Sequence, residues 1–429
     1  MTTAQDLSNE IKKDRSREFI TMVKPCGPIC NLDCTYCYYL EKKSLFKKGE
    51  HFRMQKDVLH SYVKNVIESS DFELVQFVWH GGEPTLMGIK FFKEVLEIQK
   101  RIAEEQDVEK KIVNIIQTNG VLLDDEWCKF LYENKFWVGL SLDGPKLLHD
   151  ASRRYKNGYS THRDVIKGFK NLLEVGINPD ILCTLNSTNA DHPAEIYNYF
   201  KSLGANWLQF LPIVARDSNG SLKKESVKPE QYGYFLNTVF DIWVRNDVET
   251  IIVQAFVESL LAHSNKPASL CINAETCGNA LVVEHDGSVY SCDHFVNNEH
   301  LLGNISNDKL IDMIQSDFQE EFGNAKKDRL SDDCLSCEFL NLCRGGCPKD
   351  RKKLGSSYVI VHEVGRNGAR DGVHELCIGL KQYFVHTGPI FKRMVELAKL
   401  NLPVSTVSKE LKGSESALSK EVKAKRRQK

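Results

Sequence analysis

The chain has 429 residues, of which 41% are hydrophobic and 27% charged, a composition typical of a globular protein with two or three domains and a substantial core. Its 57 Lys and Arg balance 58 Asp and Glu, so the net charge of −1 excludes a broad basic field for nucleic acid or for an anionic membrane surface. The unusual feature is the content of 14 cysteines.

The N-terminal segment, residues 1–17, is polar and has no apolar stretch of the signal-peptide type. No run in the chain approaches the ~20 apolar residues that span a bilayer, so we expect a cytoplasmic protein without a membrane partner. Thiols stay reduced in that compartment, and the cysteines therefore predict metal or catalytic sites rather than disulfides. Two isolated thiols, Cys128 and Cys183, lie on predicted apolar faces and are expected in the core.

Apolar, β-rich runs alternate with helical periodicity through the first half of the chain. Strands are expected at residues 19–23, 74–79, 111–116, 137–142, 181–185 and 207–213. Helices are expected at about 56–68, 89–104, 125–133, 162–174 and 194–203. Strands separated by helices predict a parallel sheet, and six right-handed crossovers curl into a partial (β/α)6 TIM-like barrel. An open doubly wound sheet is the alternative topology.

Polar motifs follow four of these strands in succession. The first strand runs into CNLDCTYC from Cys30, the second into HGGEPTL from His80, the third into QTNG from Gln117 and the fourth into SLDGP from Ser141. The sixth strand ends near Val214. Because the carboxyl ends of parallel strands meet at one edge of the sheet, we expect the chemistry at this edge.

The N-terminal cysteines Cys30, Cys34 and Cys37 have the spacing C-x3-C-x2-C. Three thiolates from one loop can hold three irons of a four-iron cluster and leave the fourth iron open. A structural zinc ion needs a fourth ligand, for which Cys26 is available, but this spacing is not that of a usual zinc knuckle. Cys26 is otherwise expected to be a spare thiol. Tyr36 is expected to cover the open site, with plain packing as the alternative.

The stretches KPCGPICNLDCTYCYYLEK and WHGGEPTLMG, residues 24–42 and 79–88, resemble the radical S-adenosylmethionine superfamily. In that family the open iron chelates S-adenosylmethionine, and one electron releases a 5′-deoxyadenosyl radical that abstracts hydrogen from carbon. The resemblance implies that Gly82, with Gly81, lets the backbone approach the methionine moiety and that Glu83 accepts from its ammonium.

The same resemblance implies three further contacts with S-adenosylmethionine. Ser141 matches a position that contacts the ribose, and Val214 matches one beside the adenine. Arg153 matches the position that binds the carboxylate, which suits the fork of an arginine, although Arg154 adjoins it.

The C-terminal cysteines read Cys271-x5-Cys277-x14-Cys292, then Cys334-x2-Cys337-x5-Cys343-x3-Cys347, then Cys377. Eight thiols suffice for two sites of four, and two zinc sites are the alternative to iron–sulfur clusters. The pattern resembles the SPASM-type extension of radical S-adenosylmethionine enzymes, in which the ligands interleave. By that resemblance the first auxiliary four-iron cluster is held by Cys271, Cys277, Cys292 and Cys347, and the second by Cys334, Cys337, Cys343 and Cys377, giving three [4Fe-4S] clusters in all.

Over roughly residues 18 to 385 the chain most resembles the anaerobic sulfatase-maturating enzymes. These oxidise one Cys or Ser of an unfolded or nascent sulfatase polypeptide to Cα-formylglycine, and the resemblance also implies an electron donor such as flavodoxin or ferredoxin. Asp293 matches the family's catalytic aspartate and directly follows Cys292. We expect it to take the substrate proton, with a pKa raised by burial, while an auxiliary cluster accepts the electron. His294 is the alternative base.

Two other functions remain open at this point. One is a different peptide-modifying enzyme of the same class, which forms thioether or carbon–carbon crosslinks. The other is an iron–sulfur protein that only transfers electrons. The predicted fold class is α/β, a partial (β/α)6 TIM-like barrel with a cysteine-rich C-terminal iron-sulfur domain.

The predicted domains follow from these motifs. They are a polar segment at 1–17, the radical S-adenosylmethionine barrel at 18–250, the SPASM-type domain at 251–390, and a C-terminal helix and basic tail at 391–429. Residues 215–230 are rich in turn residues and are expected to be a loop bordering a peptide channel. The tail from residue 405 has eight Lys and Arg against three Asp and Glu and is expected to be disordered.

Overall fold

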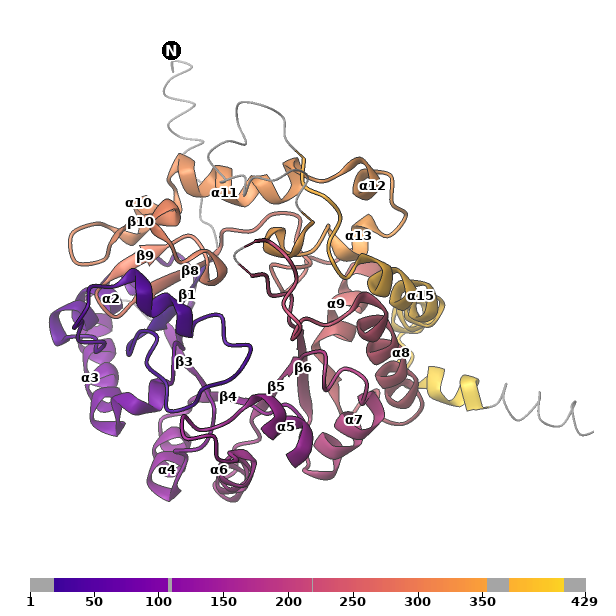
Figure 1. The fold of residues 1–429 in the computed structure, drawn as a ribbon, viewed down its shortest axis with the longest axis horizontal. Coiled ribbons are helices and arrows are strands. Elements are labelled where there is room, and N and C mark those ends of the chain that lie inside the picture. The colour runs from indigo at the N-terminus through magenta and orange to yellow at the C-terminus, as the bar shows by residue number, and fades with distance from the viewer. Residues whose placement is uncertain (1–18, 107–109, 218, 353–369, 413–429) are drawn as a thin grey trace, which may run out of the picture.

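The computed structural model describes residues 19–106, 110–217, 219–352 and 370–412 (Figure 1). The strands are β1 (Ile20–Lys24), β2 (Leu74–Trp79), β3 (Lys111–Thr118), β4 (Trp137–Ser141), β5 (Asp180–Leu185), β6 (Trp207–Pro212), β7 (Ile252–Val253), β8 (Ala280–Glu284), β9 (Ser288–Tyr290) and β10 (Leu301–Asn304). The α-helices are α2 (Lys56–Ser69), α3 (Ile89–Glu105), α4 (Asp125–Glu133), α5 (Lys146–Ser152), α6 (His162–Glu174), α7 (Pro193–Ser202), α8 (Pro229–Asn246), α9 (Gln254–His263), α10 (Leu310–Ile314), α11 (Asp317–Asp328), α12 (Asp332–Leu335), α13 (Leu340–Cys343) and α15 (Cys377–Lys399). Short 3-10 helices are η1 (Leu40–Leu45), η2 (Pro84–Met87), η3 (Asp293–Phe295), η4 (Asn298–His300) and η5 (Pro348–Asp350).

All the named strands belong to one sheet with the order β10-β9-β8-β1-β2-β3-β4-β5-β6-β7. From β1 to β7 each strand pairs in parallel with the next along the chain. A doubly wound sheet would reverse its order at the first strand, so this alternative is wrong. The helices lie around the outside of the strands (Figure 1), and the predicted α/β partial barrel is confirmed.

The sheet continues beyond the six predicted strands into the C-terminal half of the chain. Strand β8 pairs in parallel with the other side of β1, and β9 and β10 extend it as antiparallel strands. The sequence gave no expectation of this extension, because β1 and β8 are far apart in the chain. The two halves of the molecule therefore share one sheet, while the predicted domain boundaries stay predictions.

Alternating burial explains why the second strand aims its following motif at the sheet edge. Val75, Phe77 and Trp79 of β2 are buried on one side. The Trp79 indole donates from Nε1 to Asn114 Oδ1 at 2.8 Å and packs edge-on to Phe92 with ring centroids 5.5 Å apart. This anchored residue immediately precedes the HGGEP turn, so the turn begins from a rigid point.

The start of the C-terminal tail is ordered, which corrects the prediction of disorder from residue 405. Residues 406–412 form a helical segment, Val407 is buried, and Ser408 Oγ donates to the carbonyl of Val244 at 2.6 Å. The amphipathic spacing of Val407 and Leu411 accounts for this docking. Residues 413–429, like the polar segment at 1–17, lie outside the described residues. In the part of the chain that is described, no helix is long and apolar enough to cross a membrane.

Two glycines allow helices α8 and α15 to pack closely. A Cβ added to Gly379 in α15 would lie 1.9 Å from the carbonyl oxygen of Pro229, and one added to Gly233 in α8 would lie 2.8 Å from the carbonyl oxygen of Gly379. The contact matters for the site because α15 begins at Cys377, two residues before Gly379.

We expect Gly379→Ala to lower the free energy of unfolding by about 1–3 kcal/mol, because the methyl group would overlap backbone that cannot move aside. Gly388→Ala is the matched control, since it lies in the same helix and its added Cβ would have no neighbour within 4 Å. Urea denaturation of both variants measures the difference. Equal stability of the two variants would contradict the packing argument.

Candidate active site

A cavity of about 890 Å³ lies at the carboxyl ends of the barrel strands. The motifs predicted at four strand ends do meet here. Of the predicted site residues, those that line it are Cys30, Cys34, Tyr36, Cys37, Gly82, Glu83, Ser141, Arg153, Val214, Asp293, Cys343 and Cys347. The cavity is large enough for a cofactor together with part of a peptide.

The cluster loop, residues 30–37, turns its three thiols toward this cavity. Burial raises the pKa of Cys34 to about 12, and the neighbouring thiols of Cys37 and Cys30 act in the same direction. Cys26 lies apart beneath the loop, where its Sγ donates to the carbonyls of Glu83 at 3.3 Å and Ile29 at 3.5 Å.

This donor set fits a four-iron cluster with one open iron better than it fits zinc. Three thiols converge from one loop, while Cys26 is held elsewhere by backbone acceptors. Among the described residues, no three His, Cys, Asp or Glu side chains are spaced to hold a single metal ion. A zinc ion would need thiolates at about 2.3 Å from one point.

Gly82 is glycine because the cluster loop lies directly on it. A Cβ at this position would be 1.9 Å from the carbonyl oxygen of Ile29. The amides of Gly82 and Glu83 donate to the carbonyls of Gly27 at 2.9 Å and Ile29 at 3.0 Å. The close approach that glycine permits here is therefore to the protein's own loop, and an approach to a methionine moiety stays a prediction.

Glu83 is fully buried and ties the ends of β2 and β3 together. Its Oε1 accepts from the amide and hydroxyl of Thr85, at 3.1 and 2.6 Å, and from Thr118 Oγ1 at 2.7 Å. Its Oε2 accepts from the amide of Asn119 at 2.7 Å. Burial raises the pKa of Glu83, and these donors oppose the rise. Oε2 keeps room for one more donor on the cavity side.

Asp143, in the SLDGP motif, joins three parts of the site and was missed from the sequence. Its Oδ2 accepts from Tyr36 OH at 2.5 Å and from Arg153 Nε at 3.0 Å, and its Oδ1 accepts from the amide of Thr184 at 3.0 Å. The Asp143 carboxylate is fully buried, so the Arg153 charge is its compensating partner. A carboxylate directly after a strand, at the edge where the other motifs gather, was the available signal.

The Asp143 contact leaves Arg153 free to bind a ligand. Only Nε of its guanidinium is paired with protein among the described residues, and the group lies 5.6 Å from the centroid of the Tyr36 ring. Its two terminal nitrogens are thus available to a carboxylate in the cavity. Arg154 instead points away, with Nε donating to the carbonyl of Asp150 at 2.6 Å. The geometry favours Arg153 over its neighbour.

Ser141 and Val214 lie on the walls of the cavity. Ser141 Oγ accepts from Gln117 Nε2 at 3.1 Å, and the Val214 carbonyl accepts from Lys349 Nζ at 3.0 Å. The expected loop at 215–230 also borders the cavity through Arg216 and Lys223, and ends where α8 begins. Lys223 pairs with Glu41 across the cavity mouth at 3.0 Å.

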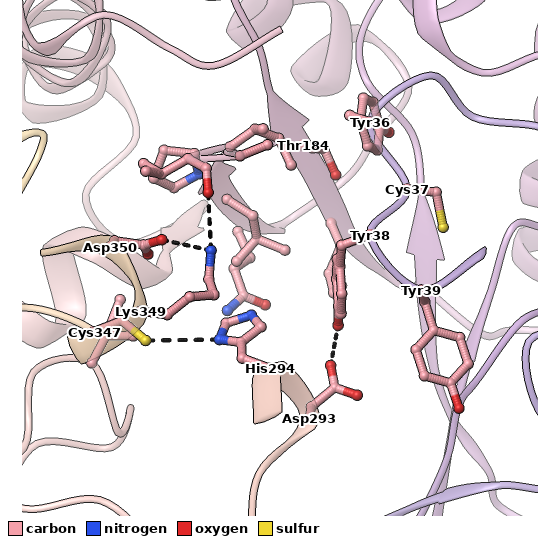
Figure 2. Close-up of a pocket in the computed structure, with 18 of the residues that line it drawn as sticks. Tyr36, Cys37, Tyr38, Tyr39, Thr184, Asp293, His294, Cys347, Lys349 and Asp350 are labelled. Carbon is pink, nitrogen blue, oxygen red and sulfur yellow. Dashed lines mark hydrogen bonds and ion pairs between the residues drawn. The ribbon is translucent and has the colours of Figure 1, made fainter. Parts of the chain in front are cut away.

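Asp293 occupies the opposite wall, in η3, and is held by two residues of the N-terminal half. Lys24 Nζ lies 2.5 Å from its Oδ1, and Tyr38 OH donates to its Oδ2 (Figure 2). Lys24, at the end of β1, is fully buried and also donates to His80 Nδ1 at 3.2 Å. His294 contacts the Sγ of Cys347 at 3.7 Å through Nδ1 (Figure 2).

The expectation of a raised pKa for Asp293 is wrong. Burial acts to raise it, but the Lys24 ammonium, with His80 and His294, holds the pKa below its ordinary value. Burial and then Lys24 lower the pKa of His80 to about 3, so His80 is neutral. The sequence reasoning missed Lys24 and Tyr38, and the available signal was a lysine closing an otherwise apolar strand.

The eight C-terminal thiols form two groups. Burial raises the pKa of Cys343 to about 11, and the thiols of Cys334, Cys337 and Cys377 add to the rise. These four also line a second, small cavity. The other group shows the same mutual effect, in which burial comes first and neighbouring thiols add to the rise; its members are Cys271, Cys277, Cys292 and Cys347.

A sharp turn separates the neighbours Cys343 and Cys347 into different groups. Arg344, Gly345 and Gly346 all have left-handed backbone, with φ of 48°, 71° and 62°. Such a run suits glycine and reverses the chain within a few residues. Cys347 thereby reaches the main cavity beside His294.

Comparison with known proteins bears on both halves of the chain. Residues 25–200 match the radical SAM superfamily and residues 271–338 match SPASM, an iron-sulfur cluster-binding domain. The chain is 38% identical over 389 residues to the serine-type anaerobic sulfatase-maturating enzyme of Bacteroides thetaiotaomicron, covering 87% of this chain and 90% of that protein. It is 35% identical over 337 residues to the cysteine-type anaerobic sulfatase-maturating enzyme of Clostridium perfringens strain 13, covering 77% and 89%.

Solved structures show the same relationship. Native anSMEcpe with bound AdoMet and Cp18Cys peptide superposes with a TM-score of 0.77 at 31% identity, covering 88% of this chain and 98% of that one. Streptococcus suis SuiB bound to S-adenosylmethionine gives a TM-score of 0.56 at 18% identity, covering 80% and 78%, and shares the fold alone.

We expect Asp143→Asn to weaken binding of S-adenosylmethionine about 10- to 100-fold, the usual range for a lost charge-assisted hydrogen bond, because Arg153 loses its compensating carboxylate. Equilibrium binding to reconstituted protein measures this, with iron content as a check on the cluster.

Asp150→Asn is the matched control. This buried carboxylate accepts from Ser160, Thr161 and His162 but contacts neither Tyr36 nor Arg153. An equal loss of binding in the control would show general destabilisation and contradict the role of Asp143.

Proposed function

The chain belongs to the anaerobic sulfatase-maturating enzymes of the radical S-adenosylmethionine superfamily, and we propose that it oxidises one Cys or Ser of an unfolded sulfatase polypeptide to Cα-formylglycine. S-adenosylmethionine and iron–sulfur clusters are its cofactors. The observation that carries the proposal is one cavity with the three thiols of the cluster loop on one wall and the carboxylate of Asp293 on another.

We assign the ligands as the sequence patterns indicated. The N-terminal cluster is held by Cys30, Cys34 and Cys37, with Tyr36 beside it. Two auxiliary four-iron clusters occupy the C-terminal groups, so the chain holds three clusters. The grouping of the eight C-terminal thiols supports this division.

S-adenosylmethionine binds between the cluster loop and the strand ends. The free nitrogens of Arg153 hold its carboxylate, and Glu83 Oε2 accepts from its ammonium. Ser141 faces the ribose, and Val214 lies at the adenine end. When bound, the cofactors supply a 5′-deoxyadenosyl radical that removes one hydrogen atom from the target Cβ, and an acceptor for the electron that remains.

Asp293 completes the oxidation as a general base. Conversion of –CH2–SH or –CH2–OH to the aldehyde level removes two electrons and two protons, so one proton is left after the hydrogen atom has gone. The low pKa of Asp293 keeps the carboxylate ionised across the neutral range. Lys24 and Tyr38 fix its orientation from the N-terminal half. His294 sits beside the Cys347 thiol, which makes it the weaker candidate.

The partners follow from the same proposal. An extended, unfolded polypeptide enters past the loop at 215–228 and η1, whose side chains border the cavity. An electron donor such as flavodoxin or ferredoxin starts each turnover, and the protein works in the cytoplasm.

The test of the function is anaerobic incubation of the reconstituted enzyme with two sulfatase-type peptides that differ only in a Cys or Ser at the target position. Mass spectrometry distinguishes the products, because the aldehyde formed from either peptide has the same mass. A thioether or carbon–carbon crosslink in place of the aldehyde would overturn the proposal, as would the absence of any change in both peptides while S-adenosylmethionine is cleaved.

Asp293→Asn should retain its iron and still cleave S-adenosylmethionine, yet form formylglycine about 10²-fold more slowly or worse, the usual effect of losing a general base. With a Cβ-deuterated peptide, deuterium should still appear in 5′-deoxyadenosine, since hydrogen abstraction comes before the proton transfer. Formylglycine at the wild-type rate would make Asp293 a bystander. Loss of four irons would instead give it a structural role.

A further inference from the structure

Lys326 in α11 is a fully buried cation without a carboxylate partner. Its side chain has no exposed surface, and its Nζ donates to the carbonyls of Cys271 at 2.6 Å, Ile272 at 2.9 Å and also Ala274. Within the described ranges, no Asp or Glu lies within ion-pair distance of it. Carbonyl dipoles satisfy its protons but leave its unit charge uncompensated, which is costly in a buried site.

The neighbouring buried cations do have a counterion. Arg351 and Arg329 both pair with Asp371, at 3.3 and 2.9 Å. Arg351 also donates from Nη2 to the carbonyl of Lys326 at 2.7 Å, so all three cations lie in one region. One carboxylate is therefore shared by two guanidinium groups, and the Lys326 ammonium adds a further positive charge. The region has an excess of buried positive charge.

The nearest ionisable groups to Lys326 are thiols of the first auxiliary group. Burial lowers the pKa of Lys326 to about 8, and the thiols of Cys277, Cys271 and Cys347 act to raise it. Conversely, burial raises the pKa of Cys277 to about 11 and the ammonium of Lys326 opposes this. An iron–sulfur cluster held by four thiolates is anionic, so it would supply the charge that the protein lacks here.

We propose that Lys326 is the counterion of the first auxiliary cluster and raises its reduction potential. Uptake of one electron adds a negative charge to the cluster, and a cation in a region of low dielectric stabilises the reduced form more than the oxidised form. This inference rests on the proposed function, in which the electron left on the substrate after loss of one hydrogen atom and one proton passes to that cluster. A one-electron acceptor, such as an oxidised carrier protein, then removes it.

The test is a redox titration of the anaerobic holoenzyme, followed by electron paramagnetic resonance, with three variants. Lys326→Met removes the charge and the hydrogen bonds, whereas Lys326→Gln removes the charge and keeps an amide donor for the carbonyls. Lys327→Met is the matched control, since it removes the same charge one residue further along α11, where no hydrogen bond to residues 271–274 is made. We expect a lower midpoint potential for one auxiliary cluster in both Lys326 variants and the wild-type value in Lys327→Met.

Each other outcome decides the matter. Unchanged potentials in both Lys326 variants, or the same shift in Lys327→Met, would overturn the proposal. If Lys326→Met loses four irons, the potential of Lys326→Gln decides; if both lose them, Lys326 only anchors the 271–274 segment and the proposal is wrong. Formylglycine formation by the wild type is measured separately, so this inference and the proposed function fail independently.

Discussion

The parallel pairing of β1 with β8 is the contact on which the architecture of the site depends. It aligns Ile20 with Ala280 and Lys24 with Glu284, and so joins the two halves of the chain in one sheet. The end of β1 leads into the cluster loop, while β8 leads through β9 to Cys292 and Asp293. Two segments that are far apart in sequence thus leave the same edge of the sheet as neighbours. A radical generated on one side and a base held on the other face a common cavity for this reason.

Buried charge at this junction is arranged in pairs. Lys24 lies between Asp293 and His80 and 4.4 Å from the centroid of the Tyr39 ring, while Tyr39 OH donates to Glu284. Removing these groups from water costs free energy that their attraction only partly returns, so they contribute little to net stability. Their value is positional, since a carboxylate fixed by an ammonium and a phenol has one orientation. The same principle applies to Asp143, which orients Arg153 and Tyr36 together.

Much of the fold and of the site could be predicted because the signals were local. Periodicity gave the six barrel strands, and spacing alone pointed to the cysteines of the cluster loop. The division of Cys343 and Cys347 between two groups came from a resemblance rather than from geometry. Long-range pairing could not be predicted: nothing near residue 280 indicates a partner at residue 20, so β8, Lys24 and the lowered pKa of Asp293 were missed together. Burial raises the pKa of an isolated carboxyl, and only the fold reveals the cation that reverses the sign.

The left-handed turn at Arg344, Gly345 and Gly346 has a consequence for how the protein matures. It places one thiol of each C-terminal group at either end of a three-residue link, Cys343 on one side and Cys347 on the other. Filling one group with metal fixes the backbone of this link, and the first thiol of the other group is then already in position. The entropy of ordering the segment is lost once for both insertions rather than twice. Metal loading of the two groups is therefore cooperative, and chains carrying only one of the two are a minor species during assembly.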